Sequence, residues 1–164
     1  MEKSPIVQEY SFDKQAQVLD LILQIQQKEY NVPITKYDQP DLFIIEEYYQ
    51  SGKGNFWVAL YNEVVVGTIS LLDIGNNEAA LRKMFVNKDY RGEKYKTASL
   101  LLDTAIKWAV EHKIKAIYLG TTPQFLAAHR FYEKNGFISI LLGDLPKGFQ
   151  VLQVDKKFYK YELE

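Results

Sequence analysis

The stretch TTPQFLAAHRFYEKNGF, residues 121–137, decides the fold of this chain. Thr122 can cap a helix, and Pro123 suits the first helical turn, where its missing amide hydrogen has no helical partner. Asn135-Gly136 then supplies the left-handed stop at which many helices end. The stretch therefore predicts a short helix that follows one strand and runs into the next.

One face of this predicted helix carries aromatic side chains. Tyr132 lies one turn after Ala128, so the two share a face, with Phe131 beside them. A tyrosine on an amphipathic helix usually packs its ring and leaves its hydroxyl at the surface. By itself, this pattern indicates a packing residue, so a chemical role for Tyr132 needs support from elsewhere in the chain.

The composition is that of an ordinary globular domain. The chain has 164 residues, of which 47% are apolar and 25% charged, so we expect a single domain over residues 1–164 with one buried core. The net charge of -1 argues against a broad basic surface for nucleic acid. The absence of cysteine excludes disulfides, thiolate metal sites and a cysteine acyl-enzyme.

No targeting or membrane signal is visible. The start, MEKSPIVQEY, lacks the apolar core of a signal peptide, and no apolar run approaches the length of a membrane span. We therefore expect a cytoplasmic protein without a membrane or nucleic-acid partner.

Apolar periodicity alternates between strand and helix along the chain. It predicts strands at residues 4–10, 55–61, 64–74, 80–86, 115–120, 137–142 and 151–158. It predicts helices at residues 13–30, 41–49 and 93–112, besides the helix of the opening stretch. Asn62-Glu63 is expected to form a hairpin turn. This order, β-α-α-β-β-β-α-β-α-β-β, indicates an α/β fold of the α+β type, with a mixed sheet and helices packed on it.

The segment AHRFYEKNGF, residues 128–137, resembles the last motif of the GNAT acetyltransferase family, A-x-x-[FL]-Y-E-K-x-G-F. The order of elements is also similar to that family over nearly the whole chain. The resemblance implies a mostly antiparallel central sheet with helices on both faces. It further implies that the strands at 80–86 and 116–120 splay apart, which frees backbone groups for the pantetheine arm of acetyl-CoA.

The resemblance also implies an activity, an acetyl-CoA-dependent N-acetyltransferase. The acetyl group would pass directly to a primary amine in a ternary complex, and Tyr132 would face the thioester sulfur. A free tyrosine has a pKa of about 10 and a thiol about 8.5, so full proton transfer would be uphill by about 2 kcal/mol. We therefore expect Tyr132 to donate a hydrogen bond to the developing thiolate.

The family's second motif, [QR]-x-x-G-x-[GA] followed by two leucines, holds the pyrophosphate of coenzyme A at a helix start, where amides and the helix dipole favour anions. Alignment on Leu101-Leu102 places Glu93 first, Lys96 at the glycine and Ala98 last. We prefer this register because it keeps the leucines in the core and a small residue at Ala98.

The other register starts from Arg91-Gly92 and puts Lys94 and Lys96 at the two glycines. In either register a lysine replaces a glycine, and the backbone amides stay available if Lys96 needs no positive φ. Three cations would then surround the pyrophosphate. The alternative is that Arg91, Lys94 and Lys96 are solvated surface charges.

The resemblance thus implies one continuous groove for acetyl-CoA. Met84 and Val86 would offer backbone contacts to pantetheine, and Thr121 and Ala128 would flank the arm. The residues expected to contact acetyl-CoA are Met84, Phe85, Val86, Arg91, Gly92, Glu93, Lys94, Lys96, Thr97, Ala98, Thr121, Ala128, Phe131 and Tyr132.

The general base is less determined. A protonated amine must lose a proton before it attacks. Many relatives use a glutamate at the position that Ala80 occupies here, and Ala80 cannot serve. Glu78 is preferred over Asp73 as a base acting through water, although either can be a solvated carboxylate. The acceptor could also arrive partly neutral and need no base.

The acceptor is expected to be a small-molecule or peptide amine. Asp41, Glu46 and Glu47 could attract a cationic amine, although acidic residues on the outer face of a helix are commonplace. His112 is expected at a helix end, where it complements the dipole, and His129 has no metal-ligand partner nearby, so no metal is expected. Many relatives pair, so a homodimer is possible. The rival functions are a non-catalytic acyl-CoA sensor and, less favoured, an interaction domain that keeps only the fold.

Overall fold

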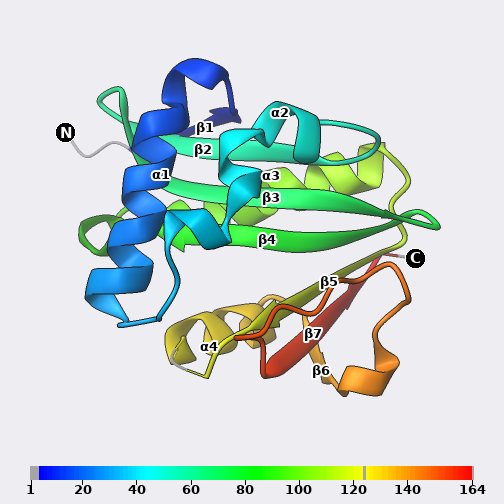
Figure 1. Ribbon diagram of the computed structural model, residues 1–164. Coiled ribbons are helices and arrows are strands. Elements are labelled where there is room, and N and C mark those ends of the chain that lie inside the picture. Colours follow the sequence, from blue (N-terminus) through cyan, green and yellow to red (C-terminus); the bar gives the residue numbers. More distant parts are fainter. Residues whose placement is uncertain (1–3, 124, 164) are drawn as a thin grey trace.

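A computed structural model describes residues 4–123 and 125–163. Its strands form a seven-stranded sheet in the order β1-β2-β3-β4-β5-β7-β6 (Figure 1). Neighbouring strands are antiparallel except for β4 and β5, which are parallel. The mostly antiparallel mixed sheet and the predicted order of elements are therefore confirmed.

The elements lie in the predicted order, and several of their ends differ from the predicted bounds. The strands are β1 Ile6–Glu9, β2 Asn55–Tyr61, β3 Val64–Gly75, β4 Glu78–Val86, β5 Ala116–Thr121, β6 Ile138–Ile140 and β7 Lys157–Glu162. The helices are α1 Gln15–Leu23, α2 Ile45–Tyr48, α3 Thr97–Glu111 and α4 Leu126–Lys134. A π-helix, Gln24–Glu29, continues α1.

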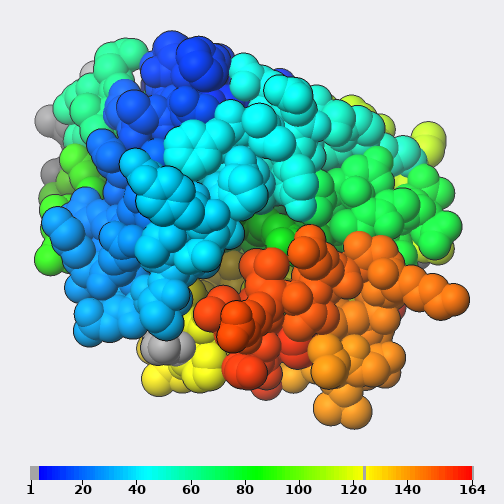
Figure 2. Space-filling view, viewed as in Figure 1, coloured from blue at the N-terminus to red at the C-terminus, as the bar shows by residue number. Residues whose placement is uncertain are grey.

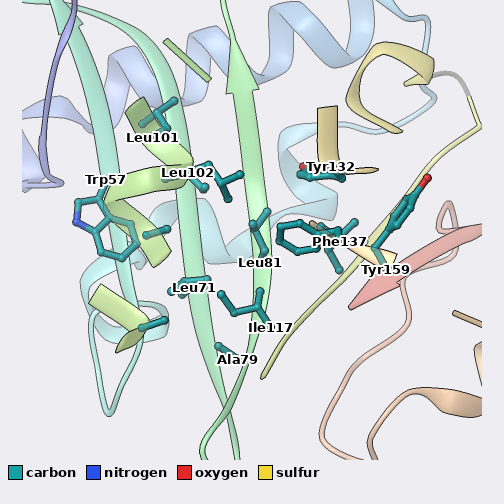
Figure 3. Close-up of a cluster of buried hydrophobic side chains, with 14 of the residues drawn as sticks. Trp57, Leu71, Ala79, Leu81, Leu101, Leu102, Ile117, Tyr132, Phe137 and Tyr159 are labelled. Carbon is teal, nitrogen blue, oxygen red and sulfur yellow. The ribbon is translucent and has the colours of Figure 1, made fainter. Parts of the chain in front are cut away.

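Helices cover both faces of the sheet (Figure 1). On one face, α1 and α2 pack with β2 around residues such as Ile22, Ile45 and Phe56. On the other face, α3 packs mainly on β2 and β3 and α4 lies against β6, and Figure 3 shows Leu101 and Tyr132 in this second core. Burial of these apolar faces is the main force that holds the helices to the sheet.

The hairpin turns have the backbone that the sequence predicts. Asn62 and Glu63 have φ values of 51° and 69°, which suit a tight turn between twisted strands. Asn76 and Asn77 repeat this with 55° and 60°, so β4 begins at Glu78, two residues before the predicted start at 80. Gly136 has a φ of 94°, so the predicted left-handed stop of α4 is confirmed.

The helix starts differ from the prediction. α4 begins at Leu126 and its N-cap is Phe125, so Thr122 and Pro123 lie in a turn before the helix. The reason is that β5 runs on through Thr121, which leaves too little chain for a helix start at 122. Gln124 lies outside the described residues. α3 begins at Thr97, four residues after the predicted start at 93.

Two further elements differ from the prediction. The predicted helix at 41–49 divides into a 3-10 turn, Pro40–Phe43, and the short α2, because Ile44, with φ -138° and ψ 46°, is outside the helical conformation. The predicted strand at 151–158 is largely a loop, and β7 begins only at Lys157, where the chain pairs with β5.

Candidate active site

The strands β4 and β5 pair over only three residues and then diverge. The pairs are Glu78 with Ala116, Ala79 with Ile117 and Ala80 with Tyr118. Beyond Ala80 the two strands separate, as Figure 1 shows, and residues 81–86 have no strand on this side. The backbone groups on this edge that neither β3 nor a side chain already bonds are therefore available to an extended ligand, because such groups need hydrogen-bond partners.

A cavity of about 370 Å³ lies at this divergence, between β4, β5, α4 and the π-helix. Figure 2 shows the hollow between the N-terminal third, in blue and cyan, and the orange C-terminal segment. Ten of the residues expected at acetyl-CoA line it: Met84, Phe85, Val86, Arg91, Gly92, Ala98, Thr121, Ala128, Phe131 and Tyr132. Glu78, Glu93, Lys94, Lys96 and Thr97 are not part of its lining.

Tyr132 is buried, with 6% of its surface exposed, and its ring packs at 5.4 Å from that of Phe137 and 6.0 Å from that of Tyr159. Among the described residues, no group forms a hydrogen bond with its hydroxyl. Burial raises the pKa of Tyr132 well above its ordinary value. The hydroxyl therefore keeps its proton and is free to donate it in a hydrogen bond.

A second hydroxyl in the cavity wall also lacks a partner. Thr122 is 5% exposed, and its Oγ1 is buried without a hydrogen bond in the described structure. Its carbonyl accepts a hydrogen bond from His129 Nε2 at 3.0 Å. Buried polar atoms are almost always paired, so an unpaired one beside a cavity indicates a place where a ligand supplies the partner.

The start of α3 shows how the chain accommodates a lysine in place of glycine. Lys96 is the N-cap, with φ 55° and ψ 31°, so the condition that it needs no positive φ is not met. A side chain in this conformation costs about 1–2 kcal/mol. The left-handed residue and the cavity-lining Ala98 lie where the preferred register puts the motif's glycine and its small residue. Thr97 supports the loop through its hydroxyl, which donates to the Tyr90 carbonyl at 2.8 Å.

Arg91 is partly exposed, and its guanidinium is held by two neighbours. Its Nη2 donates to Glu29 at 2.8 Å and its Nε to the Val86 carbonyl at 2.8 Å. Both contacts tie the end of β4 to the π-helix across the cavity. Lys94 lies over the ring of Tyr95, 5.3 Å from its centroid. Lys94, Lys96 and Glu93 are exposed at the rim of the helix start.

A bulge in β4 was not predicted. Ser70 pairs with Arg82 and Thr68 with Phe85, so β4 has one more residue than β3 in this interval. Lys83 takes a φ of 54° there. The buried hydroxyls of Thr68 and Ser70 donate to the carbonyls of Lys83 and Arg82 at 2.6 and 2.7 Å. Thr68 and Ser70, two polar residues within the apolar part of β3, are the sequence feature that could have indicated this bulge.

The bulge brings two cations to the cavity wall. Arg82 and Lys83 both line the cavity, and Arg82 Nη2 donates to the Gln150 carbonyl at 2.7 Å. Lys83 Nζ lies 3.6 Å from Asp41, and 11% of its side chain is exposed. Burial lowers the pKa of Lys83, and Asp41 opposes this effect. Asp41 therefore forms an ion pair with Lys83. It also accepts a hydrogen bond from the Tyr49 hydroxyl at 2.6 Å.

The expected base lies elsewhere. Glu78 is in β4 at the closed end of the divergence, where the Tyr118 hydroxyl donates to it at 3.4 Å. Asp73 accepts hydrogen bonds from the amides of Lys53 and Gly75, both at 2.9 Å. Neither carboxylate lines the cavity. Glu46 and Glu47 are exposed on α2.

Two absences concern the described part of the chain only. Within residues 4–123 and 125–163, no helix is long and apolar enough to cross a membrane. Over the same ranges, no group of three or more histidines and carboxylates is arranged to hold a metal ion.

Known proteins share this architecture. A GNAT-family acetyltransferase of Staphylococcus aureus Mu50 superposes with a TM-score of 0.94 and 42% identity, over 98% of this chain and 100% of that chain. The PaiA N-acetyltransferase of Thermoplasma acidophilum, solved in complex with coenzyme A, shares the fold, with a TM-score of 0.75 and 17% identity, over 98% of this chain and all of that one.

A sequence relative has a more specific name. The N-acetylaspartate synthetase of Xenopus tropicalis is 38% identical over 101 residues, which are 59% of this chain and 36% of the synthetase. The chain thus spans about a third of the length of such relatives. The model of the acetyltransferase (GNAT) family matches residues 19–137. The chain therefore belongs to the GNAT family of acetyltransferases.

Proposed function

We propose that this protein is an N-acetyltransferase that moves an acetyl group from acetyl-CoA directly to a primary amine within a ternary complex. One observation carries the proposal: the unpaired edge of β4 and the unpartnered hydroxyl of Tyr132 meet in one cavity. An extended amide-bearing arm suits the first feature, and a developing negative charge suits the second.

The donor site has the parts that acetyl-CoA needs. The backbone of Met84 and Val86 would pair with the amides of pantetheine. The N-terminus of α3 would receive the pyrophosphate, since unpaired amides and the dipole of a helix favour anions there. Lys94 and Lys96 add positive charge at that rim. The unpaired Thr122 hydroxyl is a further donor for a carbonyl or phosphate oxygen.

The transfer step requires little covalent chemistry from the protein. The neutral amine attacks the thioester carbonyl, the C–S bond breaks and the sulfur leaves with the electron pair. Tyr132 donates a hydrogen bond to the sulfur as its charge develops. A proton from the new amide nitrogen ends on the sulfur, which leaves as a thiol. No acyl-enzyme on sulfur can form, because the chain has no cysteine.

The acceptor we propose carries a carboxylate besides its amine. Arg82 and Lys83 place two cations in the cavity wall, and a carboxylate is the group that pairs with them most strongly. Two relatives carry the name N-acetylaspartate synthetase, and aspartate has both an amine and a carboxylate, so L-aspartate is the first candidate acceptor. L-Glutamate and a peptide N-terminus are the next candidates to test.

A panel of amines tests the proposal. The purified chain is incubated with acetyl-CoA and L-aspartate, L-glutamate, a neutral amino acid amide, spermidine or an N-terminal peptide, and free thiol is measured. We expect release with an amine that carries a carboxylate. Acetyl-CoA that raises the melting temperature without thiol release from any amine would indicate a sensor instead. Acetyl-CoA without effect on melting would indicate an interaction domain.

A further inference from the structure

Asp155 is a carboxylate in the cavity that the family motifs do not include. It lies in the loop before β7 and lines the same cavity as Tyr132 and Thr122. The neighbouring amide of Lys156 donates to the Thr121 carbonyl at 3.0 Å, which anchors this loop to the end of β5. Asp155 is therefore held at the place where β5 turns away from β4.

Gly120 makes room for this carboxylate. A Cβ at position 120 would lie 2.7 Å from Asp155 Oδ2 and 2.8 Å from its Cγ. Both distances are too short for any residue with a side chain unless Asp155 moves. The glycine in β5 and the aspartate in the loop therefore form one unit, which brings a carboxylate directly against the strand that lines the cavity.

A local role in the turn does not account for this position, as a second aspartate shows. The amide of Leu152 donates to Asp155 Oδ2 at 3.2 Å, and the Asp155 amide donates to the Leu152 carbonyl at 3.0 Å. Asp144 forms the same turn with Leu141, at 3.0 and 2.9 Å, yet it is exposed and outside the cavity. The turn needs an aspartate, but it needs neither burial nor a facing glycine.

The electrostatic surroundings suit a proton acceptor. Within the described residues, Asp155 forms no ion pair, and its Oδ1 has no hydrogen-bond donor. The charged groups that face it are Arg82 and Lys83 of β4. Burial raises the pKa of Asp155, while the Leu152 amide, Arg82 and Lys83 oppose the rise and favour the ionised form. A base with a raised pKa receives a proton from an ammonium group more readily than a solvated carboxylate does.

We infer that Asp155 is the general base of the acetyl transfer, with the acceptor ammonium bound between Asp155 and the thioester. This inference rests on the proposed function. Asp155 removes one proton from the ammonium, so the nitrogen lone pair becomes free to attack the carbonyl carbon. The second amine proton goes to the leaving sulfur. The proton on Asp155 passes to water when the products leave, which restores the carboxylate.

The test compares Asp155→Asn with Asp144→Asn. Both variants keep a side-chain oxygen for the turn amide, so a purely structural role predicts small and equal effects. The acceptor is L-aspartate, or the fastest amine of the panel if L-aspartate is not turned over. At pH 7 we expect Asp155→Asn to lower kcat/KM about 100-fold, and Asp144→Asn to leave it unchanged. The Kd of acetyl-CoA should be the same in both variants.

The pH profile separates catalysis from structure. An amine with a pKa near 10.4 becomes neutral by itself at high pH, so the deficit of Asp155→Asn should shrink to within about 10-fold of wild type by pH 10. A deficit that is equal at both pH values, or no deficit at pH 7, would overturn the assignment of Asp155. A wild-type protein without thiol release would instead overturn the proposed function.

A second variant tests the unit with Gly120. Gly120→Ala places a Cβ on the carboxylate of Asp155 and should reproduce the pH-dependent loss. The double variant Gly120→Ala/Asp155→Asn should be no slower than Asp155→Asn alone. An additive loss in the double variant would show that Gly120 and Asp155 act independently, which contradicts the inference that they form one unit. Thermal melting of each variant identifies any loss of activity that comes from unfolding.

Discussion

The cavity has two walls of different chemistry. The wall with Val86, Ala98, Ala128 and Tyr132, which we call the donor wall, offers free backbone, small side chains and one hydroxyl. The wall with Arg82, Lys83 and Asp155, which we call the acceptor wall, offers full charges. The donor wall therefore suits a long amide-bearing arm, whereas the acceptor wall suits a small charged molecule.

The difference also concerns how each wall is built. The donor wall comes from regular strand and helix, where the spacing of residues decides which side chains share a face. The acceptor wall comes from a bulge in β4 and a turn before β7, where the pairing of distant segments decides the geometry. The donor wall can therefore stay the same for acetyl-CoA while changes in the acceptor wall alter which amine is bound.

The largest expected effect comes from a change in the donor wall. Tyr132→Phe removes a hydroxyl that has no partner in the described structure, so it should leave the stability and the Kd of acetyl-CoA unchanged. It removes the hydrogen bond to the developing thiolate, and kcat should fall about 100-fold. Steady-state kinetics with thiol detection and calorimetric titration of acetyl-CoA measure both quantities.

Tyr159→Phe is the matched control. Tyr159 packs against Tyr132, does not line the cavity, and its hydroxyl donates to Glu133. Its variant should lower the melting temperature and keep kcat. Unchanged turnover in Tyr132→Phe would remove this hydroxyl from the mechanism and leave the donor wall a purely apolar surface.

A smaller effect is expected on the acceptor wall. Lys83→Met keeps the apolar length of the side chain and removes its charge, so the carboxylate of the acceptor loses a charged partner. The kcat/KM for L-aspartate should fall about 10-fold through KM, the low end of what is expected when a hydrogen bond to a charged group worth about 1.5–3 kcal/mol is lost. The Kd of acetyl-CoA should not change.

Lys107→Met, on the exposed side of α3, is the control for charge removal and should behave as wild type. An equal loss for an amine without a carboxylate would show that Lys83 supports the wall and does not recognise the acceptor. The same result would mean that the acceptor wall, like the donor wall, does not recognise its ligand through a charge on Lys83.

The smallest effect concerns the loop that precedes α3. Lys96→Gly relieves the positive φ of 55° and should raise the free energy of unfolding by about 1 kcal/mol. For a chain of this size the melting temperature should rise by roughly 2–4 °C. Thermal melting measures the change, and acetyl-CoA titration shows whether a closer backbone outweighs the lost cation.

Lys94→Gly is the comparison for this prediction, because Lys94 does not have a positive φ. Its variant should lose stability, since glycine adds freedom to the unfolded chain there and removes the contact of Lys94 with the Tyr95 ring. A loss of stability in Lys96→Gly as well would contradict the account of strain at the start of α3.

Local patterns predicted the parts of the molecule that depend on neighbours in sequence. The turn at Asn62-Glu63 and the stop at Gly136 have the expected backbone, because each needs a positive φ that few residues adopt. Spacing also put Ala128 and Tyr132 on one helix face, and the resemblance to the family implied most of the donor wall. Four of the residues expected at acetyl-CoA do not line the cavity: Glu93, Lys94 and Lys96 are exposed at the start of α3, and Thr97 is buried.

The acceptor wall could not be predicted in this way. Residues 81–86, LRKMFV, have the pattern of a regular strand, and nothing local indicates that Lys83 opens a bulge. The bulge depends on Thr68 and Ser70, which lie on the neighbouring strand and donate to its carbonyls. Residues 151–158 likewise have a strand pattern, but pairing with β5 starts only at Lys157.

The sequence by itself therefore determined the order of the elements, the family, and the tyrosine that faces the cavity. Tertiary structure alone decided that Glu78 lies where β4 and β5 pair, that Asp41 lies beside Lys83, and that Asp155 lies against Gly120 in the cavity. The physical reason is the range of the interactions. Helix faces and turns follow from backbone geometry within a few residues, whereas the position of a charge depends on strand register and on the segments that pack around it.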